Sequence, residues 1–535
     1  MNSDVVVVGT GLTESIVAAA LSKAGFTVIH IDSNPYYGGD QASLNVEELA
    51  QWADQQQQTS SSSQNPKFTS ISRSSSFPPN SRQFSLSLSP ALIPSTGPLI
   101  DSLVSSGVSR YGGFKLLETV ALYDGPDRVQ AVPGSKEDVF KSKTLSLLEK
   151  RRLMRFLTFA TGKFEEAKEL VGQEMTPFVS FLESVFSLNE TIAQTIAYAL
   201  AYCTSQSDAT FPALQRLRRY LLSTGRYGPS PFLVGHYGGL GELAQGFCRT
   251  AAVGGSTYIL NQHISEILHE ELSDASADSE NAKTWTIKLQ DFPEVLSCDA
   301  LISSGGLLPP SLNNMVPVSH PSEQHRIVRG FVIIDKPIHL SSQDETETMV
   351  PQDIPSAKTN TGYNAIDTAL ILFPPGKVEG GSQTSVASVL VTGEGTLSAP
   401  RGYYILHLSL PLSPSETQQD SSQRLTPYLK AALSLVNDDS ANIEPVFTLF
   451  YTEDSTELPG GTEQSTVTAR DFVAVPDTTC SYLPEVADAH TKTAEEIFWQ
   501  AVEILKHRGG KEGHEEIDSF WPPLDLQPGY DDEDS

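Results

Sequence analysis

Hydrophobic residues near the N-terminus follow the pattern of a β-α-β unit. Val5 to Val8 is a β-branched run, short enough for a buried parallel strand. Gly9 and Gly11 mark a tight turn, after which apolar residues continue for the length of a helix. Val28 to Ile31 is a second apolar run, and Asp32 follows it directly. An acidic residue about 20 positions after the first glycine is typical of dinucleotide-binding folds.

The glycine motif departs from the dinucleotide-binding pattern at its third position. Glu14 stands where G-x-G-x-x-G has its last glycine. That glycine permits close packing beside a helix N-terminus that binds pyrophosphate, whereas glutamate adds bulk and negative charge there. The carboxylate could interact with the helix dipole instead. We therefore expect a dinucleotide fold without a bound cofactor, in which Gly9, Gly11, Glu14 and Asp32 are vestigial.

The hydrophobic period changes along the chain and divides it into two domains. Residues 138–225 carry apolar residues at helical spacing, which predicts an inserted all-α domain. Residues 1–137 and 226–515 contain alternating and β-branched runs, which predicts one discontinuous domain with mixed sheets. The expected fold class is therefore α/β (α+β).

Two polar segments lie outside this pattern. Residues 55–81 are rich in glutamine and serine, which predicts a disordered surface insertion. Residues 516–535 end in an acidic run, which predicts an unstructured tail. The sequence indicates no function for either segment.

Composition restricts the classes of partner. The chain of 535 residues has 36 Lys and Arg against 65 Asp and Glu, so its formal net charge is −29. This excess of negative charge argues against nucleic acid and anionic membrane as direct partners. The four cysteines are scattered without a C-x-x-C motif, which fits reduced cytoplasmic thiols rather than disulfides or a metal site. We also expect no signal peptide and no membrane-spanning segment.

Motifs at several points resemble the Rab escort protein and Rab GDP-dissociation inhibitor superfamily. These are G-T-G-L-T-E-S-I and D-S-N-P-Y-Y-G-G near the N-terminus, R-Y-x-x-F-K from Arg110, and G-E-L-x-Q-G-F-x-R from Gly241. The resemblance is strongest over residues 4–52 and 103–260. This superfamily is built like flavin monooxygenases but is not known for flavin chemistry. The resemblance therefore implies a flavin-monooxygenase-like domain in a chain that is not itself a catalyst.

Charged residues on one predicted helix are the main candidates for partner binding. Glu242 and Arg249 are seven residues apart, about 10.5 Å along a helix, with Gln245 between them on the same face. These residues could offer complementary charges to a partner, or could simply form a solvated helix face. The resemblance implies the first reading, a Rab-binding platform. Its residues in this chain would be Tyr37, Arg82, Arg110, Glu242, Gln245 and Arg249.

The predicted helical domain carries two further expectations. The resemblance implies a cavity for the geranylgeranyl lipid of a Rab, whereas the apolar stripes alone equally predict an ordinary core. It also implies that Tyr220 and Leu221 help to dock Rab geranylgeranyl transferase. Arg218 and Arg219 flank Tyr220, so we expect its ring at the surface edge, with a core position as the alternative.

The sequence therefore favours the escort branch of the superfamily. Such a protein would bind GDP-bound, unprenylated Rab GTPases, present them to Rab geranylgeranyl transferase and deliver the prenylated product. We expect it in the cytosol, with transient membrane association. One alternative is a GDP-dissociation inhibitor that recycles prenylated Rabs. An FAD-dependent oxidoreductase is a third interpretation, which Glu14 and the lack of a late Gly-Asp pair disfavour.

Overall fold

The computed structural model describes most of the chain. The described residues are 1–62, 66–126, 128–131, 145–269, 283–308, 326–338, 366–413, 416, 419–436, 443–454, 471–476, 482–507 and 517–522. Residues 138–144 of the predicted helical domain, and all but 517–522 of the predicted acidic tail, lie outside these ranges.

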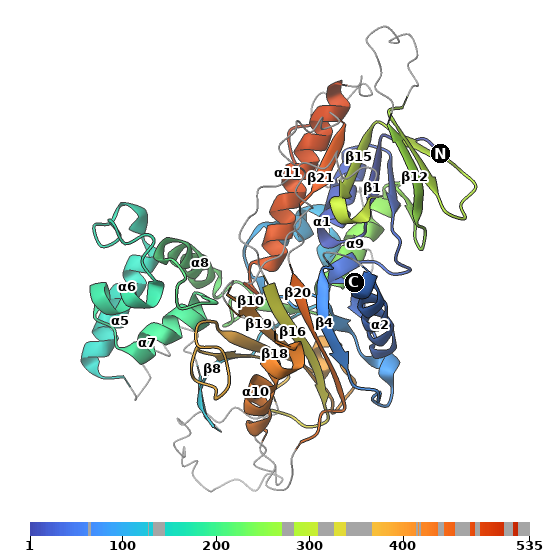
Figure 1. The fold of residues 1–535 in the computed structure, drawn as a ribbon. Helices are drawn as coiled ribbons and strands as arrows, with labels where there is room; N and C mark the ends of the chain where they lie inside the picture. Colours follow the sequence, from blue (N-terminus) through green and yellow to red (C-terminus); the bar gives the residue numbers. More distant parts are fainter. Residues whose placement is uncertain are drawn as a thin grey trace, which may run out of the picture.

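A parallel sheet forms the centre of the first layered unit (Figure 1). Its strand order among the described residues is β11-β2-β1-β15-β21, and every neighbouring pair is parallel. The strands are β11 (Thr257–Ile259), β2 (Val28–Ile31), β1 (Val5–Val8), β15 (Ala300–Ser304) and β21 (Phe472–Val475). The bounds predicted for the first two strands of the chain are confirmed.

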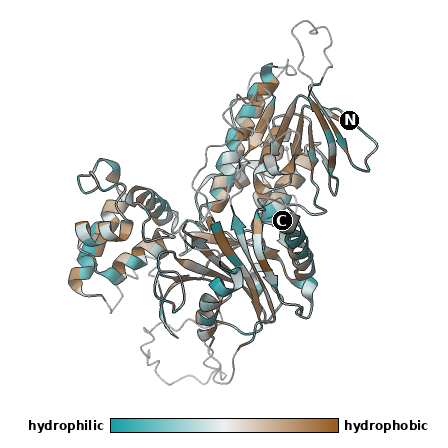
Figure 2. Ribbon diagram, in the orientation of Figure 1, coloured by the Kyte–Doolittle hydropathy of each residue, from teal (hydrophilic) through white to brown (hydrophobic). Residues whose placement is uncertain are grey.

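Helices cover one face of this sheet. They are α1 (Leu12–Lys23), α3 (Pro98–Ser106), α9 (Leu240–Val253) and α11 (Val486–His507), which share one apolar core with the sheet. A small antiparallel sheet covers the opposite face: β12 (Ile264–His269), β13 (Trp285–Leu289) and β14 (Leu296–Cys298). The strands of the parallel sheet are largely apolar, as expected for elements buried between layers (Figure 2).

A larger mixed sheet forms the second layered unit. Its order is β4-β20-β16-β19-β18-β17-β8-β9, antiparallel at each pair except the parallel pair β17 and β8. The bounds are β4 (Phe68–Arg73), β20 (Phe447–Asp454), β16 (Arg326–Ile334), β19 (Tyr404–Leu412), β18 (Ala387–Thr392), β17 (Thr368–Phe373), β8 (Thr119–Gly125) and β9 (Arg128–Ala131). Helix α10 (Ser421–Ser434) packs on one face. The predicted class, α/β with mixed sheets, is confirmed.

Shorter strand pairings lie outside these sheets. A three-stranded sheet contains β6 (Ile93–Pro94), β10 (Phe232–Gly235) and β7 (Phe114–Leu116), and β10 leads directly to α9. Strands β3 (Ser43–Leu44) and β5 (Leu86–Ser87) form a second, two-stranded pairing. A single-residue bridge between Ser205 and Ser385 ties the helical region to the mixed sheet.

The prediction of disorder over residues 55–81 is wrong for the described residues of that segment. Helix α2 (Val46–Ser62) runs into it, and β4 pairs with β20 beyond it. Trp52 on α2 packs edge-to-face against Phe68, and both rings are buried. Arg73 forms a bidentate ion pair with Asp54 at 2.8–2.9 Å. Apolar anchors and an ion pair outside the glutamine run therefore order a segment whose composition alone suggests disorder.

Helices of the 138–225 region pack around stacked phenylalanines and stand beside the β8 end of the mixed sheet (Figure 1). They are α5 (Leu147–Thr161), α6 (Phe178–Phe186), α7 (Glu190–Gln194) with a π-helical continuation over Thr195–Leu200, and α8 (Thr210–Ser223). The rings of Phe156, Phe178, Phe181 and Phe186 contact one another at centroid distances of 5.1–6.4 Å. We call these helices the helical unit.

The expectation that Tyr220 lies at the surface is wrong. Its side chain is 2% exposed, and its ring packs edge-to-face on Tyr202 and Phe232. The phenol hydroxyl donates a hydrogen bond to Glu485, which also accepts from Arg219. Leu221 is partly buried against the same core.

Arg219 takes part in a buried ion-pair cluster rather than pointing to solvent. Besides Glu485, it pairs with Asp488 at 3.0 Å, and Asp488 accepts a hydrogen bond from Leu99 N at the start of α3. Burial raises the pKa of Asp488 to about 6. Residues about 265 positions away in sequence thus supply the partners of Arg219 and Tyr220, and they fix α8 against α11 and α3.

The burial of Tyr220 gives a direct stability test. Tyr220→Ala should lower stability by about 3–5 kcal/mol, because it opens a cavity and removes one of the two donors that bind Glu485. Leu222→Ala, two positions away on α8 and 65% exposed, should change stability by about 0.5 kcal/mol or less. Chemical denaturation of both variants measures the difference. Equal small effects would contradict the buried position of Tyr220.

Candidate functional site

Asp32 and Thr10 close the first βα turn from within the chain. The Thr10 backbone N–H and hydroxyl both donate to Asp32 Oδ2, at 2.7 and 2.5 Å, and the Asn34 N–H donates to Asp32 Oδ1 at 2.7 Å. Burial raises the pKa of Asp32, and these hydrogen bonds act in the opposite direction. In a dinucleotide-binding fold the acid at this position binds the ribose. Here both of its oxygens are used by neighbouring residues.

Side chains of the chain itself also fill the phosphate side of the turn. Gln41 Oε1 accepts a hydrogen bond from Leu12 N at 3.0 Å, in the first turn of α1. The Glu14 carboxylate lies beside Gly11, where an added Cβ would stand 2.6 Å from Glu14 and 3.1 Å from Gln41. Gly9 has φ +95, and a Cβ there would stand 2.6 Å from Leu307 Cδ1 and 3.7 Å from Glu14 Oε1. Gly9, Gly11, Glu14 and Asp32 thus lie around one turn, and the Glu14 and Gln41 side chains beside Gly11 do not fit a pyrophosphate.

Close backbone contacts attach this turn to the beginning of α9. Gly38 has φ +102, and a Cβ there would stand 2.8 Å from Ala42 Cα and 3.3 Å from Gly241 Cα. A Cβ on Gly241 would stand 2.5 Å from Ser43 N and 2.8 Å from Gln41 O. Only glycine permits such approaches, so residues 38–43 and the first turn of α9 hold a fixed relation.

The outer face of α9 carries the predicted charged residues. Gln245 and Arg249 are exposed, whereas Glu242 is half-buried and burial raises the pKa of its carboxyl. The guanidinium of Arg249 lies over the ring of exposed Tyr111, 4.5 Å from its centroid. Arg110, the residue before Tyr111, is exposed as well. A fully solvated helix face would expose both Glu242 and Arg249, and this expectation is correct for Arg249 but wrong for Glu242.

The remaining predicted residues, Tyr37 and Arg82, lie on other segments of the chain. Tyr37 is partly buried, and its ring packs edge-to-face on Tyr258 at 5.9 Å. Arg82 is exposed on a short 3-10 turn (Ser81–Gln83) and pairs with Glu47 at 3.0 Å. We call the set Tyr37, Arg82, Arg110, Glu242, Gln245 and Arg249 the α9 surface. Tyr111 adjoins it, and its place in the R-Y-x-x-F-K motif is the signal that could have identified it.

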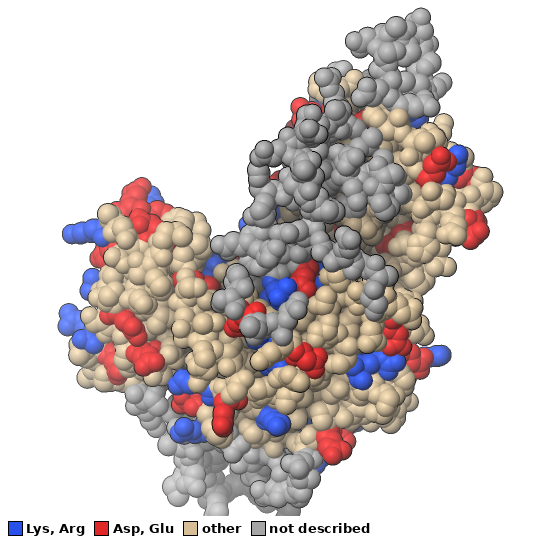
Figure 3. All heavy atoms as spheres, viewed as in Figure 1, with Lys and Arg blue, Asp and Glu red and all other residues tan. Residues whose placement is uncertain are grey.

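Acidic and basic side chains are interspersed on the face seen in Figure 3 rather than gathered into one large patch. Within the described ranges, no group of three or more His, Cys, Asp or Glu residues is placed to hold a metal ion. Across the same ranges, no helix combines the length and apolarity needed to cross a bilayer.

The chain has a dinucleotide-binding architecture, and its own side chains fill the region where such a fold binds the nucleotide. These two features define its structural class. A Rab GDI structure from Plasmodium falciparum has this fold, with a TM-score of 0.58 at 21% identity over 95% of this chain and 99% of that one. An oxidoreductase structure from Methanosarcina mazei matches with a TM-score of 0.52 at 15% identity, over 92% of this chain and 100% of that one. These likenesses concern the fold alone.

Sequence relatives identify the family. The family model described as "GDP dissociation inhibitor" matches residues 1–369, and the chain belongs to this family. A Drosophila melanogaster relative called "Rab proteins geranylgeranyltransferase component A" is 31% identical over 78% of this chain and 76% of its own length. A relative of the same description from Saccharomyces cerevisiae is 29% identical over 82% of this chain. The chain spans 66% of the length of that yeast protein.

Glu14 gives a pH-dependent test of the filled site. Burial raises its pKa from 4.5 to about 7, so the folded state retains this proton up to higher pH than the unfolded chain. The stability that this proton linkage provides is complete below pH 4.5 and is lost as the pH rises to about 7. Glu14→Gln removes the linkage. Its stability relative to wild type should therefore increase across this interval, by about 3 kcal/mol.

Urea denaturation of both proteins between pH 4.5 and 8 measures this effect. Glu266→Gln, at an exposed position of β12, provides a matched control. A difference between Glu14→Gln and wild type that stays constant with pH would show that Glu14 is not a buried carboxyl.

Proposed function

We propose that this chain is a Rab escort protein, which binds GDP-bound, unprenylated Rab GTPases and presents them to Rab geranylgeranyl transferase. The observation that carries the proposal is the α9 surface, held rigidly on a dinucleotide fold whose nucleotide site is filled. Its membership of the GDP dissociation inhibitor family supports Rab GTPases as partners. The description shared by its fly and yeast relatives supports the escort role.

The α9 surface suits a protein partner for electrostatic reasons. Tyr111 holds the guanidinium of Arg249 in place, so less side-chain entropy is lost when it binds a carboxylate. Glu242 is already partly desolvated, so a cationic group of the partner would favour its charged form. Two opposite charges about 10.5 Å apart would fix the orientation of a bound GTPase. We infer that the chain supplies no catalytic group to prenylation.

The helical unit is our candidate for the lipid and transferase side of the function. Residues 138–225 would form a domain that receives the geranylgeranyl chain, which requires its packed phenylalanine core to open. Because Tyr220 is buried and Leu221 partly buried, they would act by fixing α8 rather than by touching the transferase. The complex would form in the cytosol and associate transiently with membranes.

The main alternative is a GDP-dissociation inhibitor that recycles prenylated Rabs. The family description favours it as much as it favours an escort protein. The two functions differ in the state of the Rab: an escort protein binds the unprenylated form, and a recycling inhibitor prefers the lipidated one. Titration of this chain with GDP-loaded Rabs in both states distinguishes them.

The α9 surface predicts the effect of two substitutions on Rab binding. Arg249→Ala and Glu242→Ala should each weaken the affinity for unprenylated, GDP-loaded Rabs by about 1–3 kcal/mol, because each leaves a charged partner group unpaired. Lys288→Ala removes an exposed charge on β13 and should leave the affinity unchanged. Calorimetric titration of several Rabs provides the measurement. Wild-type affinity in both α9 variants would exclude these residues from the interface.

A further inference from the structure

Two exposed apolar residues have a backbone conformation that bulky side chains seldom adopt. Tyr237 has φ 52 and is 48% exposed, and Leu397 has φ 56 and is 43% exposed. The left-handed region is unfavourable for residues with a large side chain, and glycine or asparagine usually occupies it. Exposed apolar groups gain nothing from folding. At both positions the backbone conformation therefore disfavours the folded state, and the exposed part of the side chain gives no burial that offsets it.

Hydrogen bonds place these two residues side by side. The Tyr237 N–H donates to Thr396 O at 3.0 Å, and the Gly238 N–H donates to Ser398 Oγ at 3.2 Å. Ser85 joins both segments, because its N–H donates to Ser398 O at 2.8 Å and its hydroxyl donates to Tyr237 O at 2.6 Å. We call Tyr237 and Leu397 the apolar pair.

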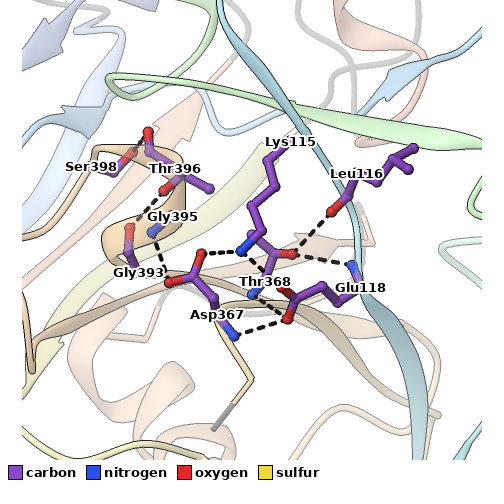
Figure 4. A network of polar contacts seen from close by, with 9 residues as sticks. All are labelled: Lys115, Leu116, Glu118, Asp367, Thr368, Gly393, Gly395, Thr396 and Ser398. Carbon is purple, nitrogen blue, oxygen red and sulfur yellow. Dashed lines mark hydrogen bonds and ion pairs between the residues drawn. The ribbon is translucent and has the colours of Figure 1, made fainter. Parts of the chain in front are cut away.

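A polar network holds the turn that carries Leu397 (Figure 4). Lys115 on β7 binds Asp367 at 2.7 Å and Glu118 at 2.8 Å, and Asp367 accepts from the Gly395 N–H at 2.9 Å. A Cβ on Gly395 would stand 2.5 Å from Lys115 Nζ. The network fixes the 3-10 turn Glu394–Thr396, so the strained residue after it cannot relax.

The apolar pair is continuous with the α9 surface. Tyr237 precedes the first residue of α9, Leu240, by three positions, and Ser85 follows Arg82 by three positions. The pair is therefore joined through short stretches of backbone to segments that carry Arg82 and Glu242, two residues of the α9 surface. An exposed aromatic ring next to charged residues is common at interface hot spots.

We propose that Tyr237 and Leu397 form an apolar anchor for the same GTPase partner, contacting an apolar side chain of the GTPase beside the charged residues of the α9 surface. This proposal rests on the proposed function. It explains why the chain retains two strained, exposed apolar residues and a network that holds them. The apolar pair would supply buried contact area, and the charges of the α9 surface would supply orientation.

Asparagine substitutions separate folding from binding at these positions. Tyr237→Asn and Leu397→Asn remove the apolar side chains, and asparagine tolerates the left-handed backbone better than tyrosine or leucine. The melting temperature should therefore stay equal or rise, while affinity for GDP-loaded, unprenylated Rabs falls about tenfold or more. Leu268→Asn on β12 is a matched control, since Leu268 is 44% exposed and lies outside the α9 surface.

The experiment measures the affinity of three purified Rabs for wild type, for Arg249→Ala and for the asparagine variants. Weaker binding by Tyr237→Asn and Leu397→Asn at an unreduced melting temperature, with Leu268→Asn at wild-type affinity, supports the anchor. Unchanged binding by both, with Arg249→Ala impaired, overturns the anchor and leaves the proposed function standing. No binding of any Rab by wild type overturns the proposed function itself.

Discussion

The constraint on which the structure depends is the close approach of three backbone segments: the first βα turn, residues 38–43 and the start of α9. Gly38 lies against Gly241, and Gly241 lies against Gln41 and Ser43, at distances that leave no space for a Cβ. A side chain at Gly38 or Gly241 would separate α9 from the loop that carries Tyr37. The α9 surface therefore has a geometry set by main-chain packing, which is stiffer than any arrangement of surface side chains.

Filling of the nucleotide site follows from the same packing. Gln41 belongs to the 38–43 segment and supplies the acceptor for the first turn of α1, while Asp32 accepts from Thr10 and Asn34. The groups that would recognise a dinucleotide thus hold the chain together. An architecture shared with an oxidoreductase thus serves here as a rigid support for an outer binding surface. Because the site is filled, the Glu14 carboxyl is buried and its pKa is raised.

Sequence reasoning succeeded where the determinants are local. The first strands, the glycine turn and the helical spacing of Glu242, Gln245 and Arg249 all depend on neighbouring residues. Sequence reasoning failed where residues far away in the sequence determine the local structure. Helix α2 and β4 are ordered by packing on β20, and Tyr220 is buried because Glu485 lies beside it. The apolar pair depends on contacts between Tyr237 and Thr396 that no local pattern indicates.

The measurement that tests the account most directly is reconstituted prenylation. Purified Rab geranylgeranyl transferase, an unprenylated GDP-loaded Rab and geranylgeranyl diphosphate are combined with this chain, with heat-denatured chain, or with neither. The account predicts that lipid transfer to the Rab requires the native chain and saturates at one chain per Rab. Equal transfer in all three reactions, with a native chain that nevertheless binds Rab, would contradict an escort role.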